Sequence, residues 1–494
     1  MKSVLRGAFA ALLLCMSFGA FAQEIYVPYI PTDKMTDVVQ CIPAPPQDPS
    51  TAFDYDILRY MWGKQQRKDP ERLAMAVRDA IWSLDTTLVI LGEPFGLKVS
   101  KESTPAIYEV LTRGVTTIEN IRYKPKAHYF RIRPFAYFKE PSIFPQDDEW
   151  LATEGSYPSG HTIRAWACAL LMAQINPATA EAVFARAWES GQSRVISGCH
   201  WQSDVDASRP VASIGYAQLQ TSDVFQRQMA LAREELRRLT TIPVMSFNVR
   251  YGTAPDGDNV WDNRKDAACA MIQDQRPAVF GVQEALGFQL DYILEHCPGY
   301  ACVGVGREDG AQEGEHMAVF YDTERIDLLK WGTYWLSETP DVPSLGWDAA
   351  CRRTATWTYL YDNCAKRKFY FVNTHLDHVG QEARRNGLLL LVKRIGAMNP
   401  EGCPMVLTGD MNVYPDDPCL KELRDLMKDA RQTAAVTDTD QTYHAWGTVS
   451  GNPPIDYVFY NGFAGCPEFK VIRQPYEGVR FVSDHYPVMA TLGW

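Results

Sequence analysis

The chain contains 494 residues, 46% of them hydrophobic, and a typical domain uses roughly 100–200 residues, so the length predicts at least two cores. The formal net charge is −11: residues 1–239 contain 26 basic and 26 acidic residues, and residues 240–494 contain 23 and 34. Neither half has the basic excess that proteins tracking long nucleic acid present to the phosphates, so such a partner is not favoured.

Residues 1–22 are typical of a secretory signal peptide. Lys2 and Arg6 precede an apolar run, Ala8–Phe18, and Ala20 and Ala22 provide the small residues of a cleavage site. The run is shorter than the roughly 20 residues that a membrane-spanning helix needs. We therefore expect a periplasmic or secreted protein with no transmembrane segment after signal cleavage. The cysteine pattern contains no CxxC pair, which argues against structural zinc and leaves the disulfide connectivity open.

Residues 23–239 are expected to form one all-α domain, because helical periodicity dominates and strand signals are weak. A Pro-rich lead, Pro28–Pro49, is expected to be extended. Ser222 is the expected N-cap of the last helix, which ends in a pair of arginines. The predicted helices are Glu71–Leu91, Pro105–Ile121, Thr162–Ile175, Thr179–Ser190 and Ser222–Leu239.

Residues 241–494 are expected to form a second domain, an α/β two-sheet sandwich in which strands alternate with helices. The pattern changes near Thr240–Thr241 with almost no linker. The predicted strands are Pro243–Arg250, Ala278–Val282, Thr354–Tyr361, Lys368–Thr374 and Met489–Leu492, with a helix at Arg264–Gln275. Thr354–Tyr361 and Lys368–Thr374 read as neighbouring strands around a turn.

Three segments of the first half combine residues that handle phosphate: KAHYFRIRP at 126–134, GSYPSGHT at 155–162 and SRVISGCHWQSD at 193–204. Three basic side chains, Lys126, Arg133 and Arg194, could clamp the oxygens of a transferred phosphoryl group. The Pro-Ser-Gly turn at 158–160 precedes an apolar helix, so its backbone N–H groups could face an anion.

The same segments contain a candidate nucleophile and a candidate acid. His200 and Asp204 are four residues apart, one helical turn, so Asp204, or a nearby carbonyl, could hold one ring nitrogen while the other attacks phosphorus. His161 would protonate the leaving alcohol. A lone His-x-x-x-Asp pair is usually a surface contact, and the joint occurrence of the three segments is what favours a site.

Together the segments resemble the three-part signature of the type-2 phosphatidic acid phosphatase superfamily, and GSYPSGHT and HWQSDVDA resemble class A bacterial non-specific acid phosphatases. The resemblance implies a helical, metal-independent phosphomonoesterase that forms a phosphohistidine at His200 and uses His161 as the acid. It assigns no separate role to His128 or Arg131. Vanadium haloperoxidases share these anion-binding residues, and haloperoxidation is the alternative reaction. The phosphate would be held by Lys126, Arg133, Ser159, Gly160 and Arg194.

Polar side chains in the second half follow apolar strands, at the ends where α/β sheets place ligands. Glu284 follows Val279–Gln283, and Asn248 ends the run Val244–Val249. Carboxylates with a nearby amide offer the oxygen ligands that Mg²⁺ takes. Near the C-terminus, His485 beside Asp484, with Asp456 to orient it, makes an acid/base unit.

The strings SFNVR, QE, NTHLDH, GDMN, PIDYVF and SDHYPV occur in a fixed order that resembles the endonuclease/exonuclease/phosphatase superfamily across residues 243–494. The resemblance implies phosphoester cleavage with Mg²⁺ or Mn²⁺, whereas the first half needs no cofactor. The implied roles are metal binding by Glu284, Asn248 and Asp484, phosphate binding by His375 and Asn412, water activation by Asp410 and a catalytic dyad of Asp456 and His485. Arg353 is a hypothetical further substrate contact.

The motifs predict the chemistry and leave the substrates open. Small phosphomonoesters and phosphodiesters are expected, and a nuclease or a sphingomyelinase-like lipid phosphodiesterase stays an alternative for the second half. We expect the second domain to cleave diesters or selected monoesters and the first to release inorganic phosphate. A non-catalytic module that binds phosphorylated ligands is the alternative of a different class. The oligomeric state is not predicted.

Overall fold

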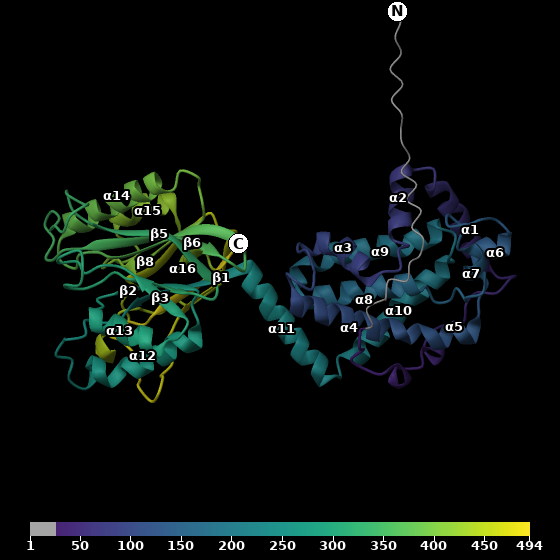
Figure 1. Cartoon of the computed structure of the whole chain (residues 1–494), viewed down its shortest axis with the longest axis horizontal. Helices are drawn as coiled ribbons and strands as arrows, with labels where there is room; N and C mark the ends of the chain where they lie inside the picture. The colour runs from purple at the N-terminus through teal and green to yellow at the C-terminus, as the bar shows by residue number, and fades with distance from the viewer. Residues whose placement is uncertain (1–25) are drawn as a thin grey trace, which may run out of the picture. The chain divides into compact units, whose positions relative to one another are not determined.

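The computed structural model describes residues 26–494, so the predicted signal peptide lies outside the described residues. The chain divides into two compact units, Met1–Leu236 and Arg237–Trp494 (Figure 1). Helix α11 (Asp223–Thr240) runs across the division, and strand β1 (Thr241–Asn248) follows it directly. Ser222 accepts the backbone N–H of Phe225 at 3.4 Å, as expected of an N-cap.

Within residues 26–236 the first unit contains helices and no strand, which confirms the all-α prediction. Short 3₁₀ turns lie at Thr32–Lys34, Val38–Gln40, Asn120–Arg122 and Pro177–Thr179. The helices before α11 are α1 (Thr51–Gln66), α2 (Pro70–Arg78), α3 (Leu84–Phe95), α4 (Pro105–Glu119), α5 (Tyr123–Tyr129), α6 (Pro134–Phe138), α7 (Asp148–Ala152), α8 (Gly160–Ile175), α9 (Ala180–Ile196) and α10 (Gln202–Leu219).

Helix α8 lies at the centre of this unit. Its small and branched apolar residues, such as Ile163, Ala167 and Leu171, are fully buried and pack against α4, α9 and α10. A helix that is apolar around most of its circumference is stable only when it is surrounded by other elements. The N-terminus of α8 carries the Pro-Ser-Gly-His segment, so this central helix fixes the position of that segment.

Two predictions for this unit are wrong in detail. The expected helix Glu71–Leu91 is two helices, because Ser83 caps α3 by accepting the N–H of Thr86 at 3.2 Å. The expected extended lead Pro28–Pro49 contains two 3₁₀ turns and buries Met35 and Val38 in the helical core. Helices α1 and α10 were not predicted, and α10 continues through an internal proline, Pro210.

The second unit contains two sheets and five α-helices, together with 3₁₀ turns at Gly257–Asn259, Pro418–Leu420 and Ala445–Gly447. The helices are α12 (Trp261–Gln275), α13 (Gly287–His296), α14 (Gln381–Met398), α15 (Lys421–Leu426) and α16 (Ala430–Thr433). After β1 the strands are β2 (Val279–Gln283), β3 (Tyr300–Val303), β4 (Val319–Asp322), β5 (Ile326–Trp335), β6 (Thr354–Asp362), β7 (Arg367–His375), β8 (Met405–Asp410), β9 (Lys428–Asp429), β10 (Val436–Thr437), β11 (Asp456–Asn461), β12 (Gly465–Val471) and β13 (Val488–Gly493).

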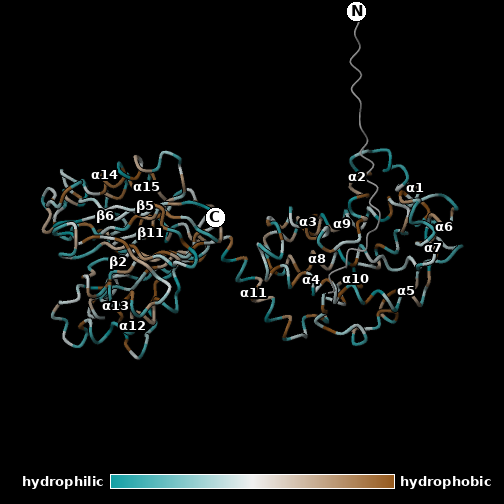
Figure 2. The backbone as a smooth tube through the Cα atoms, in the orientation of Figure 1, coloured by the Kyte–Doolittle hydropathy of each residue, from teal (hydrophilic) through white to brown (hydrophobic). Residues whose placement is uncertain are grey.

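The strands form a seven-stranded sheet in the order β10-β12-β13-β1-β2-β4-β3 and a six-stranded sheet in the order β5-β6-β7-β8-β11-β9. One core cluster, with Val244 and Phe371 among its members, lies between the sheets. A second cluster packs α12 and α13 on the first sheet, and a third packs α14 and α15 on the other. This is the predicted α/β sandwich, with helices outside both sheets and hydrophobic strands between them (Figures 1 and 2).

Strand register brings the polar strand ends together. Strands β1 and β2 are parallel, as are β7 and β8, so their carboxyl ends meet at one edge of each sheet. His375 is the register partner of Asp410, and Asp410 is in turn the partner of Asp456 across the antiparallel pair β8 and β11. The predicted neighbours β6 and β7 do pair, in antiparallel register.

Candidate active sites

His200 lies two residues before α10, and only 3% of it is exposed. Its Nδ1 is 3.4 Å from Oδ2 of Asp204, and its Nε2 is 3.2 Å from Nη1 of Arg133. A guanidinium only donates, so Nε2 accepts and Nδ1 carries the ring proton. Burial, followed by the charges of Arg133 and Lys126, lowers the pKa of His200 well below its usual value. The imidazole is therefore neutral, as a nucleophile must be.

The spacing between His200 and Asp204 has a different origin from the one expected. His200 precedes the helix, and Asp204 lies in the first turn of α10, where its Oδ2 also accepts the N–H of Trp201 at 2.9 Å. The pair is therefore held by a helix N-terminus and is not a pair of side chains on one helical face.

Arg131, to which the sequence assigned no role, holds this carboxylate. Its Nη1 donates to Oδ1 of Asp204 at 2.7 Å, and its Nη2 donates to Oδ2 of Asp56 at 2.7 Å. All three side chains are buried, so the two carboxylates share one cation. Asp56 comes from α1, far away in the sequence, and no local pattern could have identified it. His128, from the same signature loop, is exposed.

The three basic residues of the expected cradle lie together near His200. Arg133 is fixed by the carbonyls of Leu151 at 2.8 Å and Cys199 at 2.9 Å, and Lys126 donates to the carbonyl of Gly155 at 2.5 Å. Arg194 is 3% exposed, and its Nε and Nη1 have no hydrogen-bond partner. Within residues 26–494 none of the three cations forms an ion pair with a carboxylate. Buried, uncompensated cations are costly unless an anion binds among them.

Burial and the neighbouring Arg133 lower the pKa of Lys126 to about 7. Ser159 and Gly160 lie at the N-terminus of α8, where the hydroxyl of Ser159 accepts the N–H of Thr162 at 3.4 Å. Both are fully buried beside Asp204, whose carbonyl accepts the N–H of Ser159 at 3.3 Å. The predicted phosphate-binding residues of this half therefore converge around the His200 imidazole.

His161 occupies the first turn of α8. Its Nε2 is 3.0 Å from the carbonyl oxygen of Ala80, and a carbonyl only accepts, so Nε2 carries the proton and Nδ1 is free. Burial and then the charge of Arg194 lower the pKa of His161 well below its usual value. The ring contacts Trp82 edge-on, with 4.6 Å between centroids. His161 is placed to exchange a proton through Nδ1.

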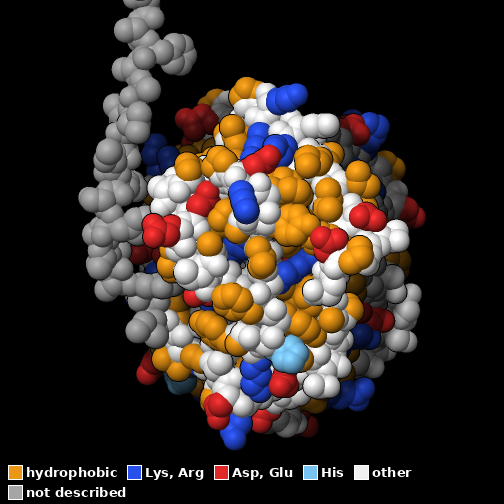
Figure 3. Space-filling view, turned by 90° about the vertical axis from the view of Figure 1, so that its right-hand side faces the viewer, with side chains coloured by type: hydrophobic (Ala, Val, Ile, Leu, Met, Phe, Trp, Pro, Cys, Tyr) orange, Lys and Arg blue, Asp and Glu red, His pale blue; other side chains and the backbone are white. Residues whose placement is uncertain are grey.

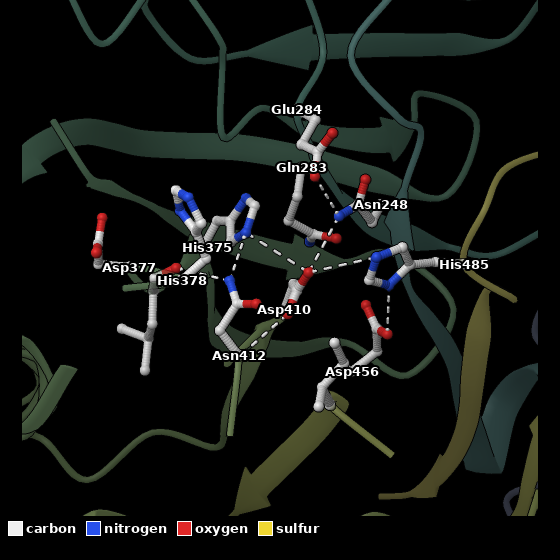
Figure 4. Close-up of polar contacts among 12 residues, drawn as sticks. Asn248, Gln283, Glu284, His375, Asp377, His378, Asp410, Asn412, Asp456 and His485 are labelled. Atoms are coloured by element: carbon white, nitrogen blue, oxygen red, sulfur yellow. Dashed lines mark hydrogen bonds and ion pairs between the residues drawn. The ribbon is translucent and has the colours of Figure 1, made fainter. Parts of the chain in front are cut away.

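The second unit has a second cluster, shown in Figure 4. Nδ1 of His485 is 2.8 Å from Oδ2 of Asp456, and its Nε2 is 3.7 Å from Oδ2 of Asp410. Burial alone would lower the pKa of His485, but the carboxylates of Asp456 and Asp410 raise it well above its usual value. Burial and the neighbouring Asp456 raise the pKa of Asp410. The three side chains form one coupled acid/base unit.

Oxygen ligands meet beside this unit. Nδ2 of Asn248 donates to Oε1 of Glu284 at 2.9 Å and to Oδ2 of Asp410 at 3.1 Å. Glu284 has a left-handed backbone, with φ +63°, and its Oε2 accepts the N–H of Tyr251 at 2.9 Å. The side chains of Glu284, His375 and Asp410 can direct ligand atoms to within 4.8 Å of one another. The two carboxylates are hard donors that suit Mg²⁺ or Mn²⁺, so Glu284 and Asp410 fit such an ion. Asn248 turns its N–H group towards them, and its Oδ1 accepts the N–H of Arg250 at 3.0 Å.

Asp484, next to His485 in the sequence, has polar partners of its own. Its Oδ1 accepts the hydroxyl of Ser483 at 3.3 Å, and its Oδ2 is 3.6 Å from Nη1 of Arg250. Arg250 also makes a bidentate pair with Asp256 at 2.9 Å. Burial raises the pKa of Asp484. The structure thus gives this carboxylate an arginine partner that the motifs did not indicate.

His375 and Asn412 lie on the other side of Asp410 (Figure 4). Nδ2 of Asn412 donates to Nε2 of His375 at 2.9 Å and to the carbonyl of Leu376 at 2.9 Å. The Nδ1 atom of His375 is buried and has no hydrogen-bond partner. Because Nε2 accepts, Nδ1 carries the ring proton, and Nε2 is the atom that faces Asn412 and Asp410.

Arg353 lies at the border of the same cluster and is 6% exposed. Its Nη2 donates to Nδ1 of His378 at 3.0 Å, and its Nε is 3.4 Å from Oδ2 of Asp377. Arg353 and Arg307 are among the charges that lower the pKa of His375, after burial. Arg307, 2.7 Å from Glu315, was missed because it stands in a loop without an adjacent strand motif.

A buried amide network braces the two sheets behind the cluster. Nδ2 of Asn373, on β7, donates to the carbonyls of Val282 at 2.7 Å and Ala318 at 3.0 Å, and its Oδ1 accepts Nε2 of Gln283 at 2.7 Å. The first residue of NTHLDH and the first of QE therefore serve as structural links across the sandwich.

No helix within residues 26–494 has the length and hydropathy needed to cross a bilayer.

Comparison with known families divides the chain in the same way. Residues 107–219 match the PAP2 superfamily, and residues 245–485 match the Endonuclease/Exonuclease/phosphatase family. A non-specific acid phosphatase of Providencia stuartii is 36% identical over 212 residues, which are 43% of this chain and 85% of that protein. One of Salmonella typhi is 38% identical over 200 residues, 40% of this chain and 78% of that protein.

Among solved structures, the mannosyl-6-phosphatase of Bacteroides thetaiotaomicron superimposes on 51% of this chain and on 100% of its own chain. The two are 31% identical in sequence, with a TM-score of 0.50.

Proposed function

Because the chain belongs to the PAP2 superfamily through its first unit and to the endonuclease/exonuclease/phosphatase family through its second, we propose that it is a bifunctional phosphoester hydrolase. That it is a phosphoesterase follows from the two families. Each unit has its own activity: the first is a metal-independent phosphomonoesterase, and the second is an Mg²⁺- or Mn²⁺-dependent phosphodiesterase or phosphatase.

In the first site, Nε2 of His200 attacks phosphorus while Asp204 holds Nδ1 and stabilises the positive charge that develops on the ring. Lys126, Arg133 and the N-terminus of α8 receive the phosphate oxygens. In the substrate complex the negative charge of the phosphate keeps His161 protonated, and this imidazolium gives its Nδ1 proton to the leaving alcohol. The neutral ring then takes a proton from the water that hydrolyses the phosphohistidine. The observation that supports this function best is the buried His200, held between Asp204 and Arg133, together with Arg194, whose buried Nε and Nη1 have no hydrogen-bond partner and can receive a phosphate oxygen.

In the second site, Glu284 and Asn248 would hold a divalent ion, with Asp484 as a further carboxylate, and the ion would neutralise charge on the phosphate. Asp410 orients the attacking water. His485, oriented by Asp456, exchanges a proton with the reacting group. His375 and Asn412 bind the phosphate oxygens. Arg353, at the border, adds positive charge beside them.

We infer that the two reactions are complementary, since a diesterase leaves a monoester that a monoesterase can hydrolyse. The acidic second unit favours small substrates over long nucleic acid. A second candidate for this unit is a sugar-phosphate monoesterase, which the similarity to a mannosyl-6-phosphatase favours. Export to the periplasm or medium belongs to the same proposal and rests on the sequence of residues 1–22.

A substrate panel tests the assignment. Wild type, His200→Ala and His485→Ala are compared on phenyl phosphate, mannose 6-phosphate and bis-p-nitrophenyl phosphate, with Mn²⁺ and with EDTA. EDTA-resistant monoester hydrolysis should disappear in His200→Ala, and EDTA-sensitive hydrolysis should disappear in His485→Ala. If the EDTA-sensitive activity hydrolyses bis-p-nitrophenyl phosphate, the second unit is a diesterase. If it hydrolyses mannose 6-phosphate alone, the second unit is a sugar-phosphate monoesterase. Plasmid cleavage blocked by Glu284→Ala would favour a nuclease.

A further inference from the structure

The loop between α2 and α3, residues 79–83, forms one wall of the first site. The carbonyl of Ala80 fixes His161 at 3.0 Å, and two residues later Trp82 contacts the same imidazole. Asp79 anchors the loop, since it accepts the hydroxyl of Ser193 at 2.7 Å and forms an ion pair with Arg186. The loop is thereby tied to α9, next to Arg194, and Trp82 has a fixed position.

The indole of Trp82 is held on one side and open on another. The guanidinium of Arg164 lies 3.6 Å from the ring centroid, and Arg164 is itself fixed by a bidentate pair with Glu119 at 2.8 and 3.1 Å. Even so, 40% of Trp82 is exposed. A large, partly exposed aromatic side chain that is held next to the His161 imidazole is suited to contact a ligand.

The aromatic surface continues beyond Trp82. The guanidinium of Arg122 lies 5.2 Å from the ring of Trp82 and 4.4 Å from the ring of Tyr123, which is 52% exposed. A β-carbon on Gly160 would lie 3.2 Å from Cδ of Arg122 and 3.4 Å from the indole, so this surface directly adjoins the N-terminus of α8. Figure 3 shows one face of the first unit, on which hydrophobic side chains are interspersed with Lys and Arg.

The chemistry of the site places the leaving alcohol on this surface. The group that protonates the leaving oxygen must be within hydrogen-bond reach of it. Nε2 of His161 is occupied by the carbonyl of Ala80, so the alcohol lies against Nδ1 of the protonated His161 ring. Trp82 is the exposed aromatic side chain that contacts the His161 ring. We propose that Trp82 lines the part of the first site that binds the leaving alcohol. As a result, this site prefers phosphomonoesters whose alcohol has a planar aromatic ring next to the ester oxygen. The inference rests on the proposed phosphomonoesterase function.

Benzyl phosphate and cyclohexylmethyl phosphate provide the test, because both leaving groups are primary alcohols of similar size and only one carries a flat ring. In EDTA, wild type should show a kcat/KM for benzyl phosphate about three- to tenfold higher, the range expected from an aromatic pair. Trp82→Leu should bring the ratio close to one, and Trp82→Phe should retain most of it. Inhibition by sulfate, which reports the phosphate cradle, should not change.

Trp150→Leu is the matched control, because Trp150 is 65% exposed on α7 and has no contact with His161. A wild-type ratio near one overturns the inference without any variant. An equal loss for both substrates in Trp82→Leu would mean that Trp82 only supports His161, and a changed ratio in Trp150→Leu would place the alcohol elsewhere; both overturn it. If neither ester is hydrolysed in EDTA, or if hydrolysis persists in His200→Ala, the proposed function itself fails.

Discussion

Arg131 donates to Asp204 at 2.7 Å, on the carboxylate whose other oxygen lies 3.4 Å from Nδ1 of His200. The position of the proposed nucleophile, His200, thus depends on an ion pair between α10 and the loop before α6, completed by Asp56 from α1. Three segments that are distant in the sequence set the orientation of one imidazole. The stability of this unit and the reactivity of His200 are therefore linked.

Removal of Arg131 should reduce both the stability of the first unit and the reactivity of His200. Arg131→Met leaves Asp204 and Asp56 as buried carboxylates without a cation, and breaking a buried pair in this way costs about 3–5 kcal/mol. Chemical denaturation followed in the presence of EDTA should show this loss, together with a fall in kcat for a monoester. Arg113→Met is the control, since Arg113 pairs with Glu109 at the surface and such pairs contribute about 0–1 kcal/mol. Equal stabilities of the two variants would contradict the account.

The affinity of the first site for anions should fall above neutral pH. Burial lowers the pKa of Lys126 to about 7, so the ammonium is charged below that pH and loses its proton above it. Sulfate is a suitable probe because it stays a dianion over this range, and its inhibition constant should rise between pH 6 and 9. Lys126→Arg should remove this dependence, because a guanidinium remains charged. A flat wild-type profile would show that Lys126 does not titrate there.

The Asp456–His485 pair should matter for turnover more than for substrate affinity. Asp456→Asn removes the carboxylate that lies 2.8 Å from Nδ1 of His485, orients the ring and favours its protonated form. General acid–base groups typically increase the reaction rate 10²- to 10⁴-fold. We expect kcat of the metal-dependent reaction to fall by about that range, with a smaller change in KM. His444→Ala is a useful comparison, since His444 is buried nearby but makes no contact with Asp456. Equal effects on kcat would argue against the dyad.

The affinity of the second site for Mn²⁺ should depend on Glu284. Its carboxylate meets Asn248 and Asp410 in the oxygen cluster, so Glu284→Gln should raise the Mn²⁺ concentration for half-maximal activity about 10- to 100-fold. Direct Mn²⁺ binding measured by calorimetry gives a readout that does not depend on turnover. Glu295→Gln, at an exposed position of α13, is the control and should bind Mn²⁺ as wild type does. Unchanged binding in Glu284→Gln would place the ion elsewhere.

The sequence predicts the second fold and part of its cluster, because four motifs end strands β1, β2, β7 and β8, and parallel strands bring their ends to one edge. Asp456 instead begins β11, and His485 lies in the loop before β13. The pairing of Asp410 with Asp456 could not be predicted, since it depends on the antiparallel register of β8 and β11. In the first unit the motifs identified His200 and Asp204, although the helical-turn argument that connected them is wrong.

Side chains that act through tertiary contacts were missed. Asp56 and Trp82 belong to segments that show only ordinary helical or loop patterns, and each reaches its site through the packing of helices. Gln283 and Asn373 were part of quoted motifs, yet their role in joining the two sheets requires knowledge of which strands face each other. Strand ends and local spacing are visible in a sequence, whereas partners across a core are not.

The most direct test of the two-site account is phosphate release from phenyl phosphate in EDTA by wild type and by His200→Ala. The account predicts full activity of wild type in EDTA, loss of activity by at least about 10³-fold in His200→Ala, and unchanged Mn²⁺-dependent hydrolysis by that variant on the substrate of the second site. Absence of phenyl phosphate hydrolysis by wild type in EDTA, or hydrolysis that survives His200→Ala in EDTA, would contradict it.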